Sequence, residues 1–503
     1  MRQLTDRLRT AGYYKWLVLL TVGVSILTSA FDVGITNIAL PELGREFDVE
    51  PDVILWVSVI YLLASLGLSL TFGSLGDAIG RKQVFLSGFL VFGLGLVIAA
   101  LSTTLPMLLV ARVIQGIGLA LFISNSDAIV VGAFPEAERA RAIGLENVFV
   151  GIGLSIGPLL GGFLLDVLGW QALFYTRIPF ILLFFVMGLV ILRNDRTEGR
   201  HVRFDFFGAI LLFIFMTTFL LALNRGPILG WSEPLIIGFT TAAAATFAVF
   251  MYVQSRPDMI VLQIRRNGVQ FLRERLPILE LNLFLIRQFS ASNATNTLQF
   301  ITQGALIILL PFFLLDGRGL TATEAGLILV TLPVVRLFVA PSAGWVADKI
   351  PTRVIATFGL ALMTVAYYAL TYIGIDTHIA IFVVVLMSLG TGISIFEPGN
   401  NTALVSSVPP HRLGTASAMI ATVRQVSQAT GIAIAGTLFA VIQRDEEARL
   451  LGAEVDAGTA MAQSVTTGYQ DVITYLTVLL VVAIFVSALR GRDPVRVSAT
   501  PQP

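Results

Sequence analysis

Fourteen stretches of mainly apolar residues are distributed along the 503 residues of this chain. Each is long enough to cross a hydrocarbon core of about 30 Å as an α-helix, which needs about 20 residues. Because lipid offers the backbone no hydrogen bonds, a spanning segment of this length is expected to be helical. The sequence therefore predicts an all-α membrane protein with fourteen transmembrane helices, at 16–40, 53–72, 84–101, 107–130, 142–165, 173–192, 206–224, 232–253, 289–315, 325–343, 353–374, 379–405, 414–442 and 472–489.

The composition excludes a water-soluble protein and several kinds of chemistry. Charged residues make up 13% of the chain and hydrophobic residues 56%, whereas a soluble protein carries about a quarter charged residues. The absence of cysteine excludes disulfides, thiolate catalysis and cysteine-bound metals. The three histidines, His201, His378 and His411, fall in or beside predicted loops, so we expect no metal site and no cofactor.

The lysines indicate the energy source. None of Lys15, Lys82 and Lys349 lies in a glycine-rich phosphate-binding loop, which excludes ATP coupling within this chain. We therefore expect an ion or solute gradient to drive it. An enzyme embedded in the membrane, or a receptor, is the remote alternative, because no histidine lies within a span beside a serine or a carboxylate.

Lysine and arginine are distributed unevenly between the two sides of the predicted membrane. Short cytoplasmic loops are enriched in these residues, and most of the 33 in this chain lie on the side of the N-terminus. We therefore predict that both termini are cytoplasmic. The basic residues form no single run, so we expect no binding of nucleic acid. The predicted external segments contain only Arg45, Arg225, Arg318, Arg444 and Arg449.

An internal repeat becomes visible when the polar loops are compared. The segment GSLGDAIGRK at 73–82 recurs as GWVADKIPTR at 344–353, each after the second helix of its half. Transporters often build two halves from such repeats, and the halves rock around a central site. At one constant offset the repeat pairs Gly73 with Gly344, Asp77 with Asp348, and Lys82 with Arg353.

The repeat divides the chain into domains. We predict an N-terminal six-helix half at 1–192, an inserted transmembrane pair at 193–255, a cytoplasmic linker at 256–288, a C-terminal six-helix half at 289–490 and a cytoplasmic tail at 491–503. Apolar and basic residues alternate near helical spacing in the linker, as in a helix that lies on an anionic leaflet. A solvated linker is the alternative, because Gly268 interrupts the pattern.

Four motifs occur in order on successive parts of the N-terminal half. They are FDVGITNIALP at 31–41, the loop GSLGDAIGRK at 73–82, ARVIQGIGLA at 111–120 and GIGLSIGPLLGG at 151–162. Together they resemble the signatures of the major facilitator superfamily, and specifically of its fourteen-spanner drug:proton antiporter branch. The residues that carry the resemblance are Asp32, Asn37, Pro41, Gly73, Asp77, Gly80, Arg81, Arg112, Gln115, Gly116, Gly118, Gly153, Gly157, Pro158, Gly161 and Gly162.

The resemblance implies two six-helix halves plus two inserted helices, and a cavity lined by helices one, four, nine and twelve. It implies a secondary active transporter that works by alternating access, most similar to a proton-coupled efflux antiporter of drugs or drug-like molecules. Its partners would be a small-molecule substrate, protons and the lipid bilayer. A multi-pass protein of the plasma membrane, the inner membrane in a bacterium, acting as a monomer, is the corresponding expectation.

Glycine spacing in the fifth span indicates close helix packing. Gly153, Gly157 and Gly161 recur every four residues, so they form one stripe on which a partner backbone can approach closely or slide. Pro158 removes a backbone donor there and loosens the helix. Ordinary packing of small residues is the alternative.

The cytoplasmic loop motif indicates a latch. Asp77 and Arg81 are four residues apart near a helix end, where a local pair can hold helices together in one state and release them in another. We expect Asp77 and its repeat partner Asp348 each to anchor a cytoplasmic latch. Gly73, Gly80 and Gly344 belong to the same gating loops.

Charged residues inside the spans are functional candidates by default, because a charge at the bilayer centre costs at least about 2.5 kcal/mol. In the helices expected to line the cavity we assign Asp32 to proton coupling with Arg112 as its partner. We predict an Arg336–Glu397 pair that recognises substrate, with a purely structural pair as the alternative. The acidic candidates are Asp32, Asp127, Glu146 and Glu397, and the basic ones Arg112, Arg177, Arg336 and Arg424.

Polar residues of helix nine complete the predicted cavity. Asn293, Asn296, Gln299 and Gln303 fall on one helical face, and we assign them to the substrate cavity with Asn37, Asp127, Arg336 and Glu397.

The chain departs from the branch's pattern after the fifth span, where Gln171 and Arg177 replace the usual arginine and asparagine. Arg177, together with Arg336, leaves a second function open. This function is the transport of an organic anion, amphiphile or other metabolite by symport or antiport.

Overall fold

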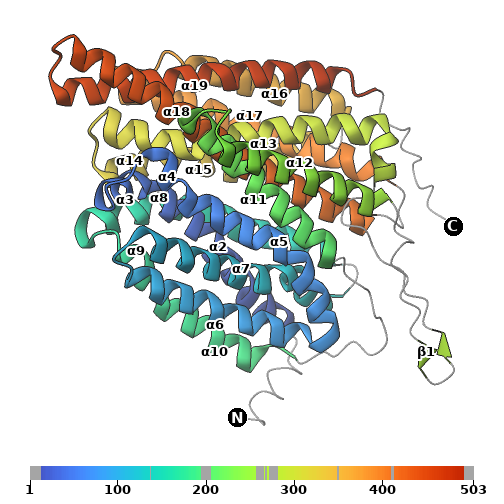
Figure 1. Cartoon of the computed structure of the whole chain (residues 1–503). Coiled ribbons are helices and arrows are strands. Elements are labelled where there is room, and N and C mark those ends of the chain that lie inside the picture. Colours follow the sequence, from blue (N-terminus) through green and yellow to red (C-terminus); the bar gives the residue numbers. More distant parts are fainter. Residues whose placement is uncertain are drawn as a thin grey trace.

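The computed structural model describes residues 13–135, 138–193, 206–255, 265–266, 269–270, 281–347, 350–408 and 413–491. The described chain is a bundle of long helices (Figure 1). The N-terminal half consists of α2 (Tyr14–Ile38), α3 (Leu40–Glu46), α4 (Pro51–Ile54), α5 (Trp56–Ile79), α6 (Arg81–Ala100), α7 (Leu105–Ala133), α8 (Arg139–Leu168), α9 (Ala172–Tyr175) and α10 (Ile178–Ile191).

The inserted pair and the C-terminal half follow. The pair is α11 (Phe206–Leu229) and α12 (Pro234–Ser255). The C-terminal half consists of η3 (Leu281–Leu285), α13 (Arg287–Phe312), η4 (Phe313–Gly317), α14 (Ala322–Leu329), α15 (Thr331–Ala347), α16 (Thr352–Leu370), α17 (Ile379–Ser406), α18 (Leu413–Gly452) and α19 (Ala457–Ala488).

Within the described residues, thirteen helical spans are long and apolar enough to cross a membrane, and up to fourteen if the bent pair Leu40–Glu46 and Pro51–Leu66 counts as one span. The bend between them is 115°. By itself, α5 has 24 residues. At a rise of 1.5 Å per residue its length is about 36 Å, which is enough to cross a hydrocarbon core of about 30 Å. The predicted all-α architecture with two six-helix halves and two inserted helices is confirmed.

The glycine stripe of α8 packs against α2 inside the N-terminal half. A Cβ atom at Gly153 would meet the carbonyl oxygen of Leu27, and one at Gly161 would meet Ile35. At Gly157 it would lie 3.0 Å from the carbonyl oxygen of Phe31. The stripe therefore serves the close packing of two helices in one half, which is the alternative that the spacing left open.

The last two helices are longer than the hydropathy pattern predicts. The expected spans were 414–442 and 472–489, but α18 continues to Gly452 and α19 begins at Ala457. The additional turns form a helical hairpin that projects beyond the rest of the bundle (Figure 1). Hydropathy detects only the part in lipid, whereas polar residues such as Glu446 and Arg449, which pair at 2.5 Å, continue the helix in water.

Two further features of the helices differ from what the sequence favours. Pro398 removes a backbone donor and, with the glycine and two asparagines that follow it, favours a broken helix, but α17 continues through that proline. Most of the linker 256–288 lies outside the described residues. Within it, β1 (Arg265–Arg266) pairs antiparallel with β2 (Val269–Gln270), so these four residues do not form the proposed interfacial helix.

The predicted cytoplasmic latches are not described by the structure. Asp348 lies outside the described residues, and of Asp77 only the backbone, within α5, is described. Gly344 lies in α15. Gly80 ends α5 with φ of +113°, a backbone conformation that favours glycine. Arg81 begins α6 and donates to the carbonyl oxygen of Ala128 at 3.5 Å.

We use outer end for the end of the bundle that carries α3, α4 and the start of α14, and inner end for the opposite one, following the predicted orientation. Figure 1 shows α3, α4 and α14 together at one end of the bundle.

Candidate functional site

A pocket between the two halves is the central feature of the interior. It encloses about 950 Å³ of empty space, including the part open at its mouth. We call it the central pocket; its walls are Val33, Gly34, Asn37, Ile38, Leu154 and Pro158 of the N-terminal half, and Gln303, Leu306, Ile307, Leu310, Pro311, Leu329, Leu332, Pro333, Arg336, Met363, Tyr367, Leu386, Ile393 and Gln428 of the C-terminal half.

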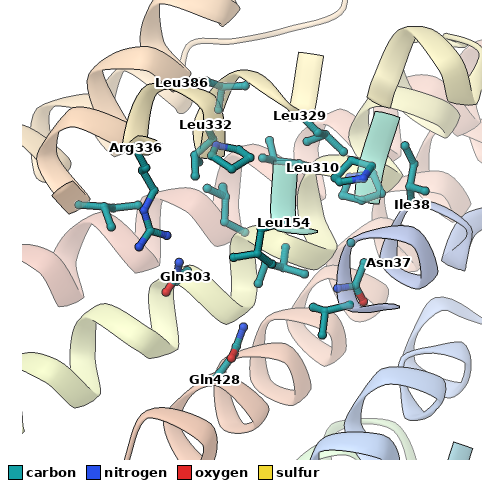
Figure 2. A pocket seen from close by; sticks show the side chains of 18 of the residues that line it. Asn37, Ile38, Leu154, Gln303, Leu310, Leu329, Leu332, Arg336, Leu386 and Gln428 are labelled. Carbon is teal, nitrogen blue, oxygen red and sulfur yellow. The ribbon is translucent and has the colours of Figure 1, made fainter. Parts of the chain in front are cut away.

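The polar groups of the central pocket are few and gathered. Figure 2 shows Arg336, Gln303 and Gln428 converging on one side, with Asn37 facing the same space from α2. The remaining wall is largely leucine and isoleucine. An apolar wall with a few directed polar groups is typical of sites for small molecules.

The predicted cavity residues divide into two groups. Asn37, Gln303 and Arg336 line the central pocket. Asn293, Asn296 and Gln299 do not: their side chains are buried by neighbouring helices. The prediction that they line this pocket is wrong. Helical periodicity predicts that the three side chains share one face of the helix, but it does not predict which neighbouring elements cover that face.

Two further residues differ from the prediction for the pocket. Asp127 is exposed and does not line the central pocket. Gln428 of α18, which lines it, had no assigned role; an amide inside an otherwise apolar span was the signal available.

Arg336 and Glu397 form the predicted pair. Arg336 Nη2 of α15 donates to Glu397 Oε2 of α17 at 2.6 Å. Both side chains are 23% exposed, and Arg336 lines the central pocket. The carboxylate therefore neutralises the charge that Arg336 brings to the pocket wall.

A second ionic cluster lies within the N-terminal half, away from the central pocket. Asp32 of α2 is fully buried and accepts a hydrogen bond from Arg112 Nη1 of α7 at 2.9 Å. Its other oxygen accepts from Arg177 Nη1, at the start of α10. One carboxylate thus serves two guanidinium groups, so the cluster carries a net charge of +1 and favours the ionised carboxylate in this conformation.

Each arginine of the cluster has further partners. Arg112 Nε donates to the carbonyl oxygen of Val57 at 2.9 Å, and its guanidinium lies 4.1 Å from the ring centre of Tyr61. Arg177 Nε donates to the carbonyl oxygen of Leu173 at 2.6 Å. The sequence paired Asp32 with Arg112 but missed Arg177, whose departure from the family pattern was the signal.

The halves are joined at the outer end by α8 and α14. Asp166 of α8 accepts from the backbone N–H groups of Ala322 and Thr323 at 3.1 and 2.7 Å, and from the Thr323 hydroxyl. A carboxylate at a helix N-terminus is stabilised by the helix dipole. Gly162 lies against the Ala322 carbonyl with no room for a Cβ atom. We call these contacts the outer seal.

Other outer contacts cross between the halves. Arg45 lies 3.7 Å from Asp316, and Arg444 lies 3.4 Å from Glu50. The inserted helix α11 takes part, because Asn224 donates to the hydroxyl of Thr437 at 3.0 Å and accepts from the indole of Trp56 at 3.1 Å. The inserted helix α11 thus helps close the outer end, which its apolar sequence did not indicate.

Two helical halves that enclose a pocket between them are the arrangement of many membrane transporters. The sequence profile described as Major Facilitator Superfamily matches residues 22–432. The chain belongs to this superfamily. Within the described residues no group of three or more His, Asp or Glu side chains could hold a metal ion.

Similar proteins agree with this assignment. The riboflavin transporter RibZ of Clostridioides difficile (strain 630) is 29% identical over 85% of this chain and 88% of its own length. The multidrug resistance protein Stp of Mycobacterium tuberculosis (strain CDC 1551 / Oshkosh) is 29% identical over 84% of this chain and 76% of its own length. The multidrug relatives are consistent with the fourteen-spanner antiporter branch.

Solved structures share the fold. A bacterial homologue of the human lysosomal transporter Spinster, in an inward-facing and unoccupied conformation, superposes with a TM-score of 0.65. The match covers 95% of this chain and 97% of that one at 16% identity, so it supports the architecture alone.

Proposed function

We propose that this protein is a proton-coupled exporter of amphiphilic, drug-like small molecules. The observation that supports the proposal is the central pocket, whose wall is mostly apolar and carries amides plus one neutralised arginine. Such a wall suits neutral or zwitterionic molecules with a large apolar surface. The relatives named as a riboflavin transporter and as a multidrug resistance protein support the same class of solute.

The outer seal gives the conformational part of the proposal. With α8 and α14 joined at the outer end, the pocket is closed on that side. Alternating access then requires the seal to open while contacts form at the inner end, for which Asp77 and Asp348 remain the predicted latches. We place the protein in the plasma membrane as a monomer with both termini cytoplasmic.

Proton coupling is assigned to the Asp32 cluster. The carboxylate is ionised while both Arg112 and Arg177 contact it, so a proton can replace a guanidinium only when the surrounding helices move apart. Since α2 and α8 pack along the glycine stripe, such a movement would be transmitted to the half-to-half interface. Protonation and rearrangement are thereby linked.

A flux measurement tests this function. Purified protein in proteoliposomes, with an imposed pH gradient and a panel that includes riboflavin, cationic dyes and organic anions, should show solute-dependent proton movement. Vesicles without protein are the control. Solute movement without any associated proton movement would refute proton coupling, and movement of organic anions alone would favour the second function.

The Arg336–Glu397 pair gives a prediction about substrate preference. Glu397→Gln leaves Arg336 in the pocket wall without its counter-ion, so we expect the preference to shift toward anionic solutes by about tenfold, equivalent to 1.4 kcal/mol. The double variant Arg336→Glu with Glu397→Arg keeps an ion pair between the two positions, so it should fold whatever the role of the pair. Competition assays in proteoliposomes give the readout, and normal preference in the swapped variant would show that the pair is only structural.

A further inference from the structure

Glu146 of α8 is a buried carboxylate that the proposed mechanism does not use. Its residue surface is only 4% exposed. Neither carboxylate oxygen has a hydrogen-bond partner among the described residues. Burying a charged group without partners is costly, and a protonated carboxyl avoids most of that cost.

Among the described residues, one titratable group lies close enough to act on the charge of Glu146. Asp127 of α7 lies near enough for its charge to repel one on Glu146, and Arg424 of α18 is the cation that attracts Asp127. Asp127 and Glu146 belong to the N-terminal half, whereas Arg424 belongs to the C-terminal half. The position of the cation relative to the two carboxyls therefore depends on how the halves are arranged.

Among the described residues, the other charged groups on the helices packed against α8 have partners. The helices concerned are α2, α7, α9, α14 and α15, and α9 carries no charged residue. Their charged residues with other partners are Lys15 with Glu138, Asp32 with Arg112 and Arg177, Arg336 with Glu397, and Glu324 with Thr321.

Glu146 is also separate from the Asp32 cluster. Along the α2–α8 contact, Phe149 lies against Gly23 and Gly157 against Gly34. Asp32 is thus level with residues near Gly157, about ten residues beyond Glu146, which corresponds to about 15 Å along the helix. A proton cannot pass directly between carboxyls that far apart, so Glu146 is a distinct site toward the inner end.

We propose that Glu146 is a second proton-binding group of the transport cycle, located on the inner side, which holds its proton in the conformation seen here. When the halves rearrange and Arg424 reaches the carboxyl, the O–H bond breaks, the proton passes to a water molecule, and the guanidinium compensates the carboxylate. This role rests on the proposed proton-coupled function. Protonation at Glu146 can nevertheless be observed without transport.

The first experiment measures protonation directly. Infrared spectra of the purified full chain, titrated with pH, should contain a C=O stretch of a protonated carboxyl at neutral pH that disappears in Glu146→Gln. Asp127→Asn removes the repelling charge, so the same band should disappear at a pH about one unit lower. Glu233→Gln, at an exposed outer position, is the control and should leave the band unchanged.

The second experiment measures coupling in proteoliposomes. Glu146→Gln should retain substrate counterflow, which needs no net proton transfer. The rate of its pH-gradient-driven transport should fall at least about tenfold, the factor that corresponds to one pKa unit. An unchanged infrared band in Glu146→Gln, or unchanged coupling in that variant, would overturn the proposal. A band assigned to Glu146 in a wild-type protein without proton flux would support proton binding and refute the proposed function instead.

Discussion

Asp32→Asn is expected to abolish proton-driven transport while leaving substrate counterflow measurable. Asparagine preserves the shape of the side chain and can still accept a hydrogen bond from one of the two arginines through its single oxygen, but it cannot bind or release a proton. The exchange between proton and guanidinium that we assign to this site is then lost. Uptake driven by an imposed pH gradient, compared with counterflow at equal pH on both sides, gives the measurement.

Stability should respond more strongly to Asp32→Ala. That change leaves two buried guanidinium groups, 1% and 3% exposed, without a counter-ion. Loss of one partner from a buried ion pair costs about 3–5 kcal/mol, so we expect poor yield and a lowered unfolding temperature in detergent. Adding Arg177→Leu removes one of the two cations and should recover part of the loss. Proton-driven transport that survives in Asp32→Asn would contradict the assignment of coupling to this residue.

Gly162→Ala is expected to open the outer seal. The added methyl group would overlap the backbone carbonyl of Ala322, which belongs to the start of α14 and cannot rotate away as a side chain could. Overpacking of this kind costs about 1–3 kcal/mol. Because the overlap exists only while α8 and α14 are in contact, the cost falls on the outer-closed conformation and shifts the population toward the outer-open one.

Accessibility of the central pocket measures this shift. The chain contains no cysteine, so Ile38→Cys in the pocket wall introduces the only thiol. An impermeant thiol reagent added at the outer side should label it about tenfold faster with Gly162→Ala, the factor for 1.4 kcal/mol. Gly132→Ala is the matched control, since nothing lies within 4 Å of its added Cβ atom. Equal labelling rates in the two variants would refute a seal at this contact.

The sequence by itself determined the class of the protein. The length and apolarity of its segments require membrane-spanning helices, because lipid cannot satisfy an open backbone, and this constraint acts residue by residue along the chain. The repeated loop and the four ordered motifs then indicated the two halves and the superfamily. The Arg336–Glu397 pair was also predictable, because opposite charges at equal depth on helices of one half are stabilised by contact.

Other features were decided only by the tertiary structure. Arg177 reaches Asp32 across 145 positions, Asn224 of the inserted pair contacts Thr437, and Gln428 enters the central pocket while Gln299 does not. Each depends on the rotation of a helix about its axis. In helices that are apolar all round, periodicity leaves that rotation unspecified, and the close packing of neighbouring helices sets it. Depth in the membrane is thus a local property of the sequence, whereas the partner that a buried polar group meets is a property of the assembled bundle.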